Sequence, residues 1–233
     1  MSLILKAVSI YFMVFDMTVT IIFLIAAVCG YLLGSIPFGL VLTRLAGCGD
    51  IRKIGSGNIG ATNVLRTGRK DLALLTIILD ASKAGFAAYL AYKLTAAVPF
   101  EFFGIPTTAN VMAELIAGTF GVLGHNFPVW LKFKGGKGVA STFGFLLATN
   151  WLVALLALAT WLIMAFATRY SSLSAITAAV LVPVYAFFLA TPVYSIFYTA
   201  LAILVLARHH ANIARLIKGQ ESKITFKKKE EKK

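Results

Sequence analysis

Three long stretches without a charged side chain constrain the fold of this chain more than any other feature. They run from residue 17 to 43, from Gly138 to Thr168 and from Tyr170 to Ala207. About 20 apolar residues suffice for a helix to cross a bilayer. Apolar residues make up 59% of the chain and charged residues only 13%, about half the usual charged share of a globular protein. The sequence therefore predicts an all-α, polytopic integral membrane protein and excludes a soluble domain.

The formal net charge of +13 does not indicate binding to nucleic acid. Much of the positive charge lies in the terminal run 223–233, and the remainder lies in a few loops between apolar stretches. Lys and Arg in such loops mark the cytoplasmic ends of membrane helices. We expect the basic end of the chain to lie in solvent near anionic headgroups. Membrane lipids, and not nucleic acid, are therefore the expected partners.

The charges between the apolar stretches also predict the topology. Basic loops follow the first and third stretches, whereas the loop 94–108 carries only Glu101. Thr149-Asn150 and Pro192 divide the later apolar blocks into pairs of shorter helices. Seven spans result, near residues 18–45, 71–93, 109–129, 139–149, 151–168, 173–189 and 193–207. Alternation of the basic loops places the N-terminus outside and the C-terminus in the cytoplasm.

The same reading divides the chain into three parts. We interpret residues 1–17 as an N-terminal extension and not as a cleaved signal peptide, because no small-residue cleavage site precedes the first span. Residues 18–219 form a single membrane-embedded domain, and residues 220–233 form a basic cytoplasmic tail.

Gly55–Arg66 is the first of three polar segments expected on the cytoplasmic face. Its glycines allow tight turns that bring backbone N–H groups against a ligand, and Arg66 provides a planar cation suited to phosphate. Neutral hydrogen-bonding groups surround them at Ser56, Asn58, Thr62 and Asn63. Taken alone, the segment is equally typical of a Gly-rich turn that caps a helix.

The second polar segment comprises Gly124–Pro128 and Lys132–Ser141. It is not a Walker A motif, because no glycine stands five residues before Gly136 and Gly138 replaces the expected Ser or Thr. What remains is a glycine turn at the start of a helix beside Lys137, which is a pattern typical of an anion site. Membrane anchoring by positive charge explains Lys132 and Lys134, but it does not explain the glycines around Lys137.

The third polar segment comprises Arg169–Ser174 and, one helical hairpin later, Arg208–Arg215. In a continuous helix, Arg208, Asn212 and Arg215 lie near one face. We expect no metal site, because the chain has three histidines and none lies in a ligand-rich cluster. Within the spans, Asp80 and Lys83 are expected to neutralise each other, and Glu114 has no evident partner.

Together these motifs resemble a known family. The residues that carry the resemblance are Gly34–Gly39, Gly55–Arg66, Gly124-His125 with Lys134–Ala140, and Arg208-His209 with Asn212-Ile213 and Arg215-Leu216. In order, over residues 28–219, they resemble the bacterial acyl-phosphate:glycerol-3-phosphate acyltransferases (PlsY). The resemblance implies a seven-helix enzyme of the bacterial inner membrane with a cytoplasm-facing site. It implies acyl transfer from acyl phosphate to the 1-hydroxyl of glycerol 3-phosphate in phospholipid biosynthesis, without a cofactor. It also implies a functional link to the enzyme that makes acyl phosphate.

The resemblance also assigns residues. It implies catalytic roles for His209, Asn212, Ser172 and Lys137. It implies substrate or phosphate binding by Ser35, Ser56, Gly57, Asn58, Gly60, Thr62, Asn63, Arg66, His125, Lys134, Gly135, Gly136, Gly138, Ser141 and Arg208. One departure is evident: the family usually reads Ser-Leu-Ala-Ser in the third motif, and this chain reads Ser172-Leu173-Ser174-Ala175. Ser172 is therefore the serine carried over.

Two other functions were weighed. Acyltransferases that use thioesters usually place Asp five residues after His, but Trp130, Ala214 and Arg215 stand at those positions here. A membrane transporter of phosphate or another anion predicts polar residues along a path through the midplane, and usually an internal repeat. Within the spans only Asp80, Lys83 and Glu114 qualify, and no repeat is evident. The transporter remains the non-enzyme alternative. Within the acyltransferase reading, either His209 or a phosphate oxygen of the substrate takes the hydroxyl proton.

Overall fold

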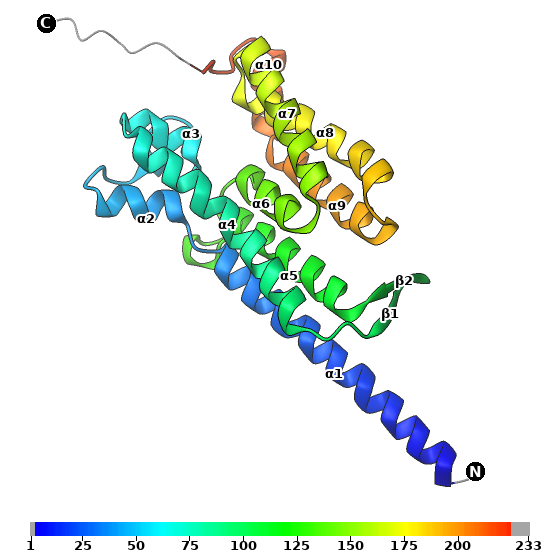
Figure 1. The fold of residues 1–233 in the computed structure, drawn as a ribbon. Helices are drawn as coiled ribbons and strands as arrows, with labels where there is room; N and C mark the ends of the chain where they lie inside the picture. The colour runs from blue at the N-terminus through cyan, green and yellow to red at the C-terminus, as the bar shows by residue number, and fades with distance from the viewer. Residues whose placement is uncertain (1–2, 225–233) are drawn as a thin grey trace, which may run out of the picture.

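The structure, a computed structural model, describes the backbone of residues 3–224 and the side chains of residues 17–224. Ten helices dominate this part of the chain (Figure 1). They are α1 (Leu3–Gly34), α2 (Phe38–Leu45), α3 (Ala61–Val64), α4 (Lys70–Leu94), α5 (Ala109–Asn126), α6 (Val139–Thr149), α7 (Trp151–Thr168), α8 (Ser171–Leu189), α9 (Pro192–Arg208) and α10 (His210–Ile217). Short 3₁₀ turns form at η1 (Ile51–Lys53), η2 (Leu65–Thr67) and η3 (Val129–Leu131). Most of the expected basic tail, residues 225–233, lies outside the described residues.

Several helices are long and apolar enough to cross a membrane. Four segments meet this requirement by length and composition: Met17–Leu45, Lys70–Leu94, Trp151–Thr168 and Ser171–Leu189. The pair formed by α9 and α10 makes a fifth if its 56° bend lies within one span. A helix lies at each of the seven expected positions, but α6 has only 11 residues, a length of about 16 Å at 1.5 Å per residue. The protein is therefore a multi-pass membrane protein with four or five segments of full spanning character.

The span expected over 18–45 agrees with the segment Met17–Leu45, but this segment is not one continuous helix. α1 ends at Gly34, and α2 begins at Phe38 after a break at Ser35–Pro37. Pro37 lacks an N–H and cannot continue the hydrogen-bond ladder. The break turns α2 away from the axis of α1 (Figure 1).

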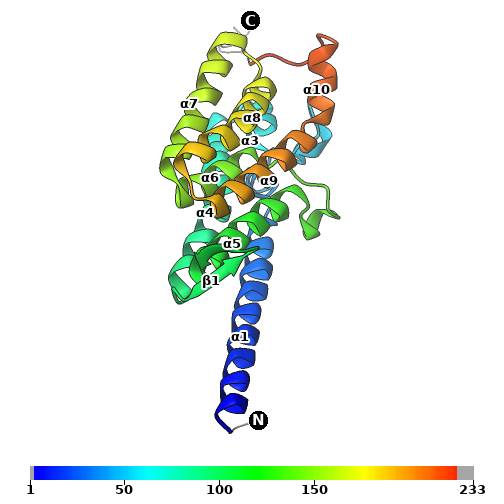
Figure 2. The same cartoon turned by 90° about the vertical axis from the view of Figure 1, so that its right-hand side faces the viewer.

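The loop between α4 and α5 contains the one departure from an all-helical fold among the described residues. Strands β1 (Pro99–Phe102) and β2 (Ile105–Thr108) pair antiparallel, with Phe102 opposite Ile105. The hairpin lies at the opposite end of the bundle from α2, α3 and α10, and the N-terminal part of α1 extends past it (Figures 1 and 2). The polar segments and the hairpin thus occupy opposite ends of the molecule.

The helices pack so that α6 and α9 meet in the core. α1 packs along α5, α4 lies against α5 and α6, and α7, α8 and α9 pack in succession. Phe145 of α6 is fully buried, and its ring meets that of Tyr198 of α9 edge-on, with 5.8 Å between centroids. Tyr198 also shares a hydrogen bond of 2.6 Å with Thr149. Nearby, Tyr194 Oη donates to Glu114 Oε2 at 2.7 Å, which supplies the partner that the sequence did not reveal.

We predict that Phe145→Ala lowers the free energy of unfolding by about 3–5 kcal/mol, because it opens a cavity between α6 and α9. Thermal unfolding of the purified protein in detergent measures this loss. Phe187→Ala is the matched control, since 76% of the Phe187 side chain is exposed. Equal destabilisation by the two substitutions would contradict the packing described.

Candidate active site

The first polar segment folds around the side chain of Asn63, which is 1% exposed. Asn63 Nδ2 donates to the carbonyl oxygens of Ile51 at 2.7 Å and Asn58 at 2.8 Å, and Asn63 Oδ1 accepts from the Ser56 N–H at 3.2 Å. Asn58 Oδ1 accepts from the Gly60 N–H at 3.1 Å. Both asparagine side chains therefore brace the loop from within, and substrate contact by either remains a prediction.

Arg66 lies over the turn that begins at Gly55. Gly55 has φ +54°, and a Cβ there would overlap the Arg66 guanidinium, so glycine is required both by the backbone and by the close approach. Arg66 Nη2 donates to Ser222 Oγ at 3.2 Å. Ser56, Gly57 and Arg66 are exposed. This segment therefore presents one cation and exposed backbone to solvent.

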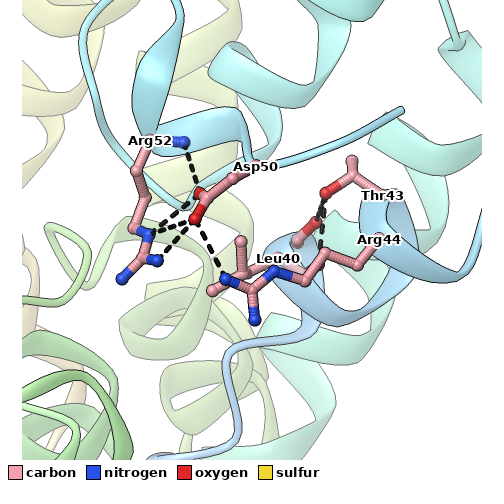
Figure 3. Close-up of polar contacts among 6 residues, drawn as sticks. Leu40, Thr43, Arg44, Asp50 and Arg52 are labelled. Carbon is pink, nitrogen blue, oxygen red and sulfur yellow. Dashed lines mark hydrogen bonds and ion pairs between the residues drawn. The ribbon is translucent and has the colours of Figure 1, made fainter. Parts of the chain in front are cut away.

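Asp50 ties the turn η1, which precedes this segment, to α2, as Figure 3 shows. Its carboxylate accepts from Arg52 Nε at 2.9 Å, from the Arg52 N–H at 3.0 Å and from Arg44 Nη2 at 3.0 Å. The hydrogen bonds from Arg52 hold the pKa of Asp50 well below its ordinary value. This group was not predicted from the sequence, although Asp50 is the single acidic residue between positions 17 and 70 and stands among basic ones.

In the second polar segment, both the backbone N–H groups and the carbonyl oxygens of Gly135 and Gly136 are hydrogen-bonded. The Gly135 N–H donates to Asn126 O at 3.2 Å, and the Gly136 N–H donates to His125 O at 3.0 Å. Arg208 Nε and Nη2 donate to Gly136 O at 3.1 and 3.0 Å, and Nη2 also donates to Gly135 O at 3.1 Å. Residues of α5 and α9 therefore both hold this loop, and the Arg208 guanidinium uses several of its N–H donors in hydrogen bonds to the loop.

The third polar segment converges on Glu221, which lies beyond α10. Its carboxylate accepts from Ser172 Oγ at 2.8 Å, from Asn212 Nδ2 at 2.7 Å and from Arg215 Nε at 2.6 Å. Burial raises the pKa of Glu221, but the hydrogen bonds from these three donors outweigh it and leave the pKa below its ordinary value. The expectation treated Glu221 as part of a solvated tail. Its isolated position in a basic segment was the available signal.

The break between α9 and α10 overturns the expectation of one continuous helical face. The two helices bend by 56°, so Arg208 contacts the glycine loop while Asn212 and Arg215 contact Glu221. His209 lies at the break and is 2% exposed, with Nδ1 at 2.7 Å from Val205 O. A carbonyl accepts only, so Nδ1 carries the proton and Nε2 keeps its lone pair.

Lys137 is the point at which the three segments meet. Its ammonium interacts electrostatically with Glu221 and with three arginines, Arg215, Arg208 and Arg66. Burial lowers the pKa of Lys137 to about 8; Glu221 opposes this shift and the arginines add to it. Four cations from three segments around one carboxylate make a strongly electropositive site, which suits a phosphate dianion.

Three of the expected contact residues lie in the interior of the protein. Ser35, Ser141 and His125 are all buried. Ser35 Oγ donates to Tyr31 O at 2.8 Å, and Ser141 Oγ donates to Asp80 O at 2.7 Å. Their hydroxyl donors are therefore used inside the protein, and direct substrate contact by these residues stays a prediction.

The remaining expected residues lie at the edge of the site or within its loops. Lys134 and Thr62 are exposed, and Gly138 is buried where α6 begins. Ser174, next to the unusual Ala175, is fully buried and donates to Tyr170 O at 2.8 Å. Its hydroxyl is therefore committed to the helix and does not replace a serine at 175.

Comparison with known proteins identifies the family of this chain. A family model described as glycerol-3-phosphate acyltransferase matches residues 7–219. A protein of Rhodospirillum rubrum named glycerol-3-phosphate acyltransferase is 58% identical to this chain over 206 residues, which cover 88% of this chain and 92% of the relative. A protein of Maricaulis maris with the same name is 55% identical, and the match covers 92% of this chain and 93% of the relative. The chain belongs to the glycerol-3-phosphate acyltransferase family.

Solved structures of an integral membrane glycerol 3-phosphate acyltransferase, PlsY (YgiH), are similar to this fold. The glycerol 3-phosphate form has a TM-score of 0.76 and 36% identity, covering 87% of this chain and 96% of that one. The lysophosphatidic acid form has a TM-score of 0.75, also at 36% identity. The helical arrangement is therefore shared with a membrane enzyme of the same family.

We predict that Arg66→Ala and Lys137→Ala each lower kcat/KM at least tenfold, since a charged hydrogen bond is worth roughly 1.5–3 kcal/mol. Steady-state kinetics in detergent test this. Lys132→Ala is the control, because Lys132 is exposed and lies outside the contacts of the site. Equal losses in all three variants would indicate an effect of general surface charge.

The lowered pKa of Lys137, about 8, predicts a pH dependence. Lys137 loses its charge as the pH rises through that value, so the KM for a phosphate-bearing substrate should rise between about pH 7 and about pH 9. Lys137→Arg should flatten this rise, because a guanidinium stays protonated throughout the range. An identical alkaline rise in the arginine variant would show that another group causes it.

Proposed function

We propose that this protein transfers a fatty acyl group from acyl phosphate to the 1-hydroxyl of glycerol 3-phosphate, yielding lysophosphatidate and inorganic phosphate. The observation that carries the proposal is the gathering of basic side chains from all three polar segments. Arg66 donates to Ser222 Oγ, Arg215 donates to the neighbouring Glu221, and Arg208 holds the loop that precedes Lys137. All three arginines act electrostatically on Lys137. Both substrates carry phosphate, and membership of the glycerol-3-phosphate acyltransferase family supports the acceptor. The names of the similar PlsY structures include glycerol 3-phosphate and lysophosphatidic acid, which are this acceptor and this product.

The chemistry needs no covalent enzyme intermediate. The 1-hydroxyl oxygen attacks the acyl carbonyl carbon, a C–O bond forms, and the bond from that carbon to the phosphate oxygen breaks with its electron pair leaving on phosphate. Phosphate is a good leaving group, so the enzyme has to position the two substrates and stabilise the developing negative charge. Lys137 and Arg66 supply that charge stabilisation. Ser172 and Asn212 both donate hydrogen bonds to Glu221, which in turn acts electrostatically on Lys137.

The hydroxyl proton has two possible acceptors. His209 Nε2 keeps a lone pair, because Nδ1 donates to Val205 O, and a phosphate oxygen of the substrate, which titrates near about pH 6, is the other candidate. An acyl phosphate is electrophilic enough to need little help, which favours the phosphate oxygen and makes His209 a positioning residue. Asn212 then orients the substrate.

The membrane placement is also part of the proposal. Seven helices cross or enter the bacterial inner membrane, with the N-terminus outside and the C-terminus in the cytoplasm. Residues 1–17 precede a single acyltransferase domain over 18–219, and 220–233 form a tail of which Glu221 belongs to the site. The acyl chain lies between apolar helices among membrane lipids, and acyl phosphate arrives from the enzyme that makes it.

Phosphate release by purified protein tests the reaction. Acyl phosphate and glycerol 3-phosphate together should release phosphate and form lysophosphatidate, whereas acyl phosphate alone should release little. Replacement of acyl phosphate by an acyl thioester should abolish product. Equal phosphate release without glycerol 3-phosphate, or anion flux into protein-containing vesicles without product, would favour the transporter alternative.

Cysteine labelling tests the orientation. Ser56→Cys and Lys134→Cys place exposed thiols in the first and second polar segments, and we expect labelling by an impermeant reagent only after the membrane is opened. The native Cys29 and Cys48 are first replaced by Ala. Efficient labelling of either variant in intact cells would overturn the topology.

The pH profile of His209→Gln separates the two proton acceptors. If His209 is the base, the substitution should remove the acidic limb of kcat/KM and cost roughly 10²–10⁴-fold. If the substrate phosphate is the base, the acidic limb should survive, because phosphate titrates near about pH 6. We expect survival of the limb. His210→Gln should be mild in either case, since His210 is exposed.

A further inference from the structure

A second polar cluster, formed by Asp80, Lys83 and His125, lies buried beneath the site. Their side chains are 4%, 1% and 5% exposed. Lys83 Nζ contacts Asp80 Oδ1 at 2.9 Å, His125 Nδ1 at 2.9 Å and the Ile36 carbonyl oxygen at 3.0 Å. An ammonium has three N–H donors, so all three are used. The expected neutralising pair is confirmed, and His125 extends it from α4 to a second helix, α5.

Stability alone does not explain such a cluster. Removing charges from water costs several kcal/mol per ion, and apolar replacements of buried pairs are often neutral or stabilising. The cluster spans three places in the chain: the break at Ile36, the middle of α4, and the end of α5. This arrangement gives it a fixed geometry and not merely a neutral charge.

The backbone of two cluster residues holds the chain on both sides of Lys137. On the first side, His125 O accepts from the Gly136 N–H at 3.0 Å, and a Cβ on Gly136 would overlap His125 Nε2. On the other side, Asp80 O accepts from Ser141 Oγ at 2.7 Å, in the first turn of α6. Lys137 lies between these two points of contact in the sequence.

We propose that Asp80, Lys83 and His125 are positioning residues that set the conformation of the Gly135–Gly138 loop and so place Lys137. The Nε2 edge of the imidazole lies against Gly136 from α5, while Arg208 holds the carbonyls of the same loop from α9. Because Lys83 donates to His125 Nδ1, the proton of the neutral ring lies on Nε2, toward Gly136. This inference rests on the proposed role of the loop in binding substrate phosphate.

Kinetic constants test the proposal. Asp80→Asn and His125→Gln should each raise the KM for glycerol 3-phosphate or for acyl phosphate about tenfold or more, with a smaller fall in kcat, because small misplacements of binding groups are costly. A KM does not depend on the folded fraction, so mere instability would lower the apparent kcat only. Asp71→Asn is the matched control on the same helix, where the carboxylate pairs with Arg69 in an exposed position, and it should change neither constant.

A double-mutant cycle keeps the proposal testable if a charge variant folds poorly. Gly136→Ala should impair the enzyme strongly in the native background, because the added methyl group meets the imidazole. In a His125→Ser background that space is free, so Gly136→Ala should add little. Purely additive effects of the two substitutions on kcat/KM would overturn direct positioning of the loop by His125.

Lys137→Ala distinguishes failure of the positioning proposal from failure of the assignment on which it rests, that the glycine loop binds substrate phosphate. If Lys137→Ala raises the KM for either substrate but Asp80→Asn and His125→Gln leave both KM values unchanged, the positioning role is overturned and the phosphate assignment stands. If Lys137→Ala leaves both KM values unchanged, the loop does not bind phosphate, and the positioning proposal falls with that assignment.

Discussion

The hydrocarbon core of a bilayer offers no hydrogen bonds, and this constraint governs the rest of the structure. Each backbone polar group at that depth must be satisfied within the protein, so the chain crosses as helices. Irregular backbone is then confined to helix ends and breaks. In this protein the break after Gly34, the loop before α6 and the bend at His209 are such places, and each contributes to the site or to its support.

The same constraint decides how charges are arranged. Within the spans, Lys83 has its three donors satisfied by Asp80, His125 and a carbonyl freed at the helix break. At the electropositive site the arrangement is the reverse: four cations share one carboxylate, that of Glu221. A site with fewer carboxylates than cations is poised to bind an anion, whereas the charges of the buried cluster already neutralise one another. The contrast separates binding groups from positioning groups.

Apolar run lengths and charged loops allowed most of the fold to be predicted, because both follow directly from bilayer thickness and loop charge. The helical positions agree, whereas the break at Pro37 and the hairpin 99–108 were missed. Both features depend on local backbone geometry inside or between apolar runs, and hydropathy carries no information about it. Lys137 and Arg66 could be predicted because glycine turns beside cations form anion sites.

Tertiary contacts account for what the sequence could not reveal about the site. Glu221 is the second residue of an apparently solvated tail, and only the fold brings it against Ser172 and Asn212. The motif around His125 predicts that this side chain binds substrate, yet packing buries it against Lys83. In both cases the residue type was informative, but its partner lay on a helix remote in sequence.

The charge balance of the site assigns Lys137 a role that no arginine can share. Arg66, Arg208 and Arg215 remain protonated at all accessible pH values, so they cannot relieve their mutual repulsion. Lys137 is the member of this group able to discharge, and burial beside the arginines lowers its pKa to about 8. A bound phosphate dianion reverses that pressure, because it stabilises the ammonium form. Substrate binding and protonation of Lys137 are therefore linked: the fraction of Lys137 in the ammonium form is highest when substrate phosphate is bound.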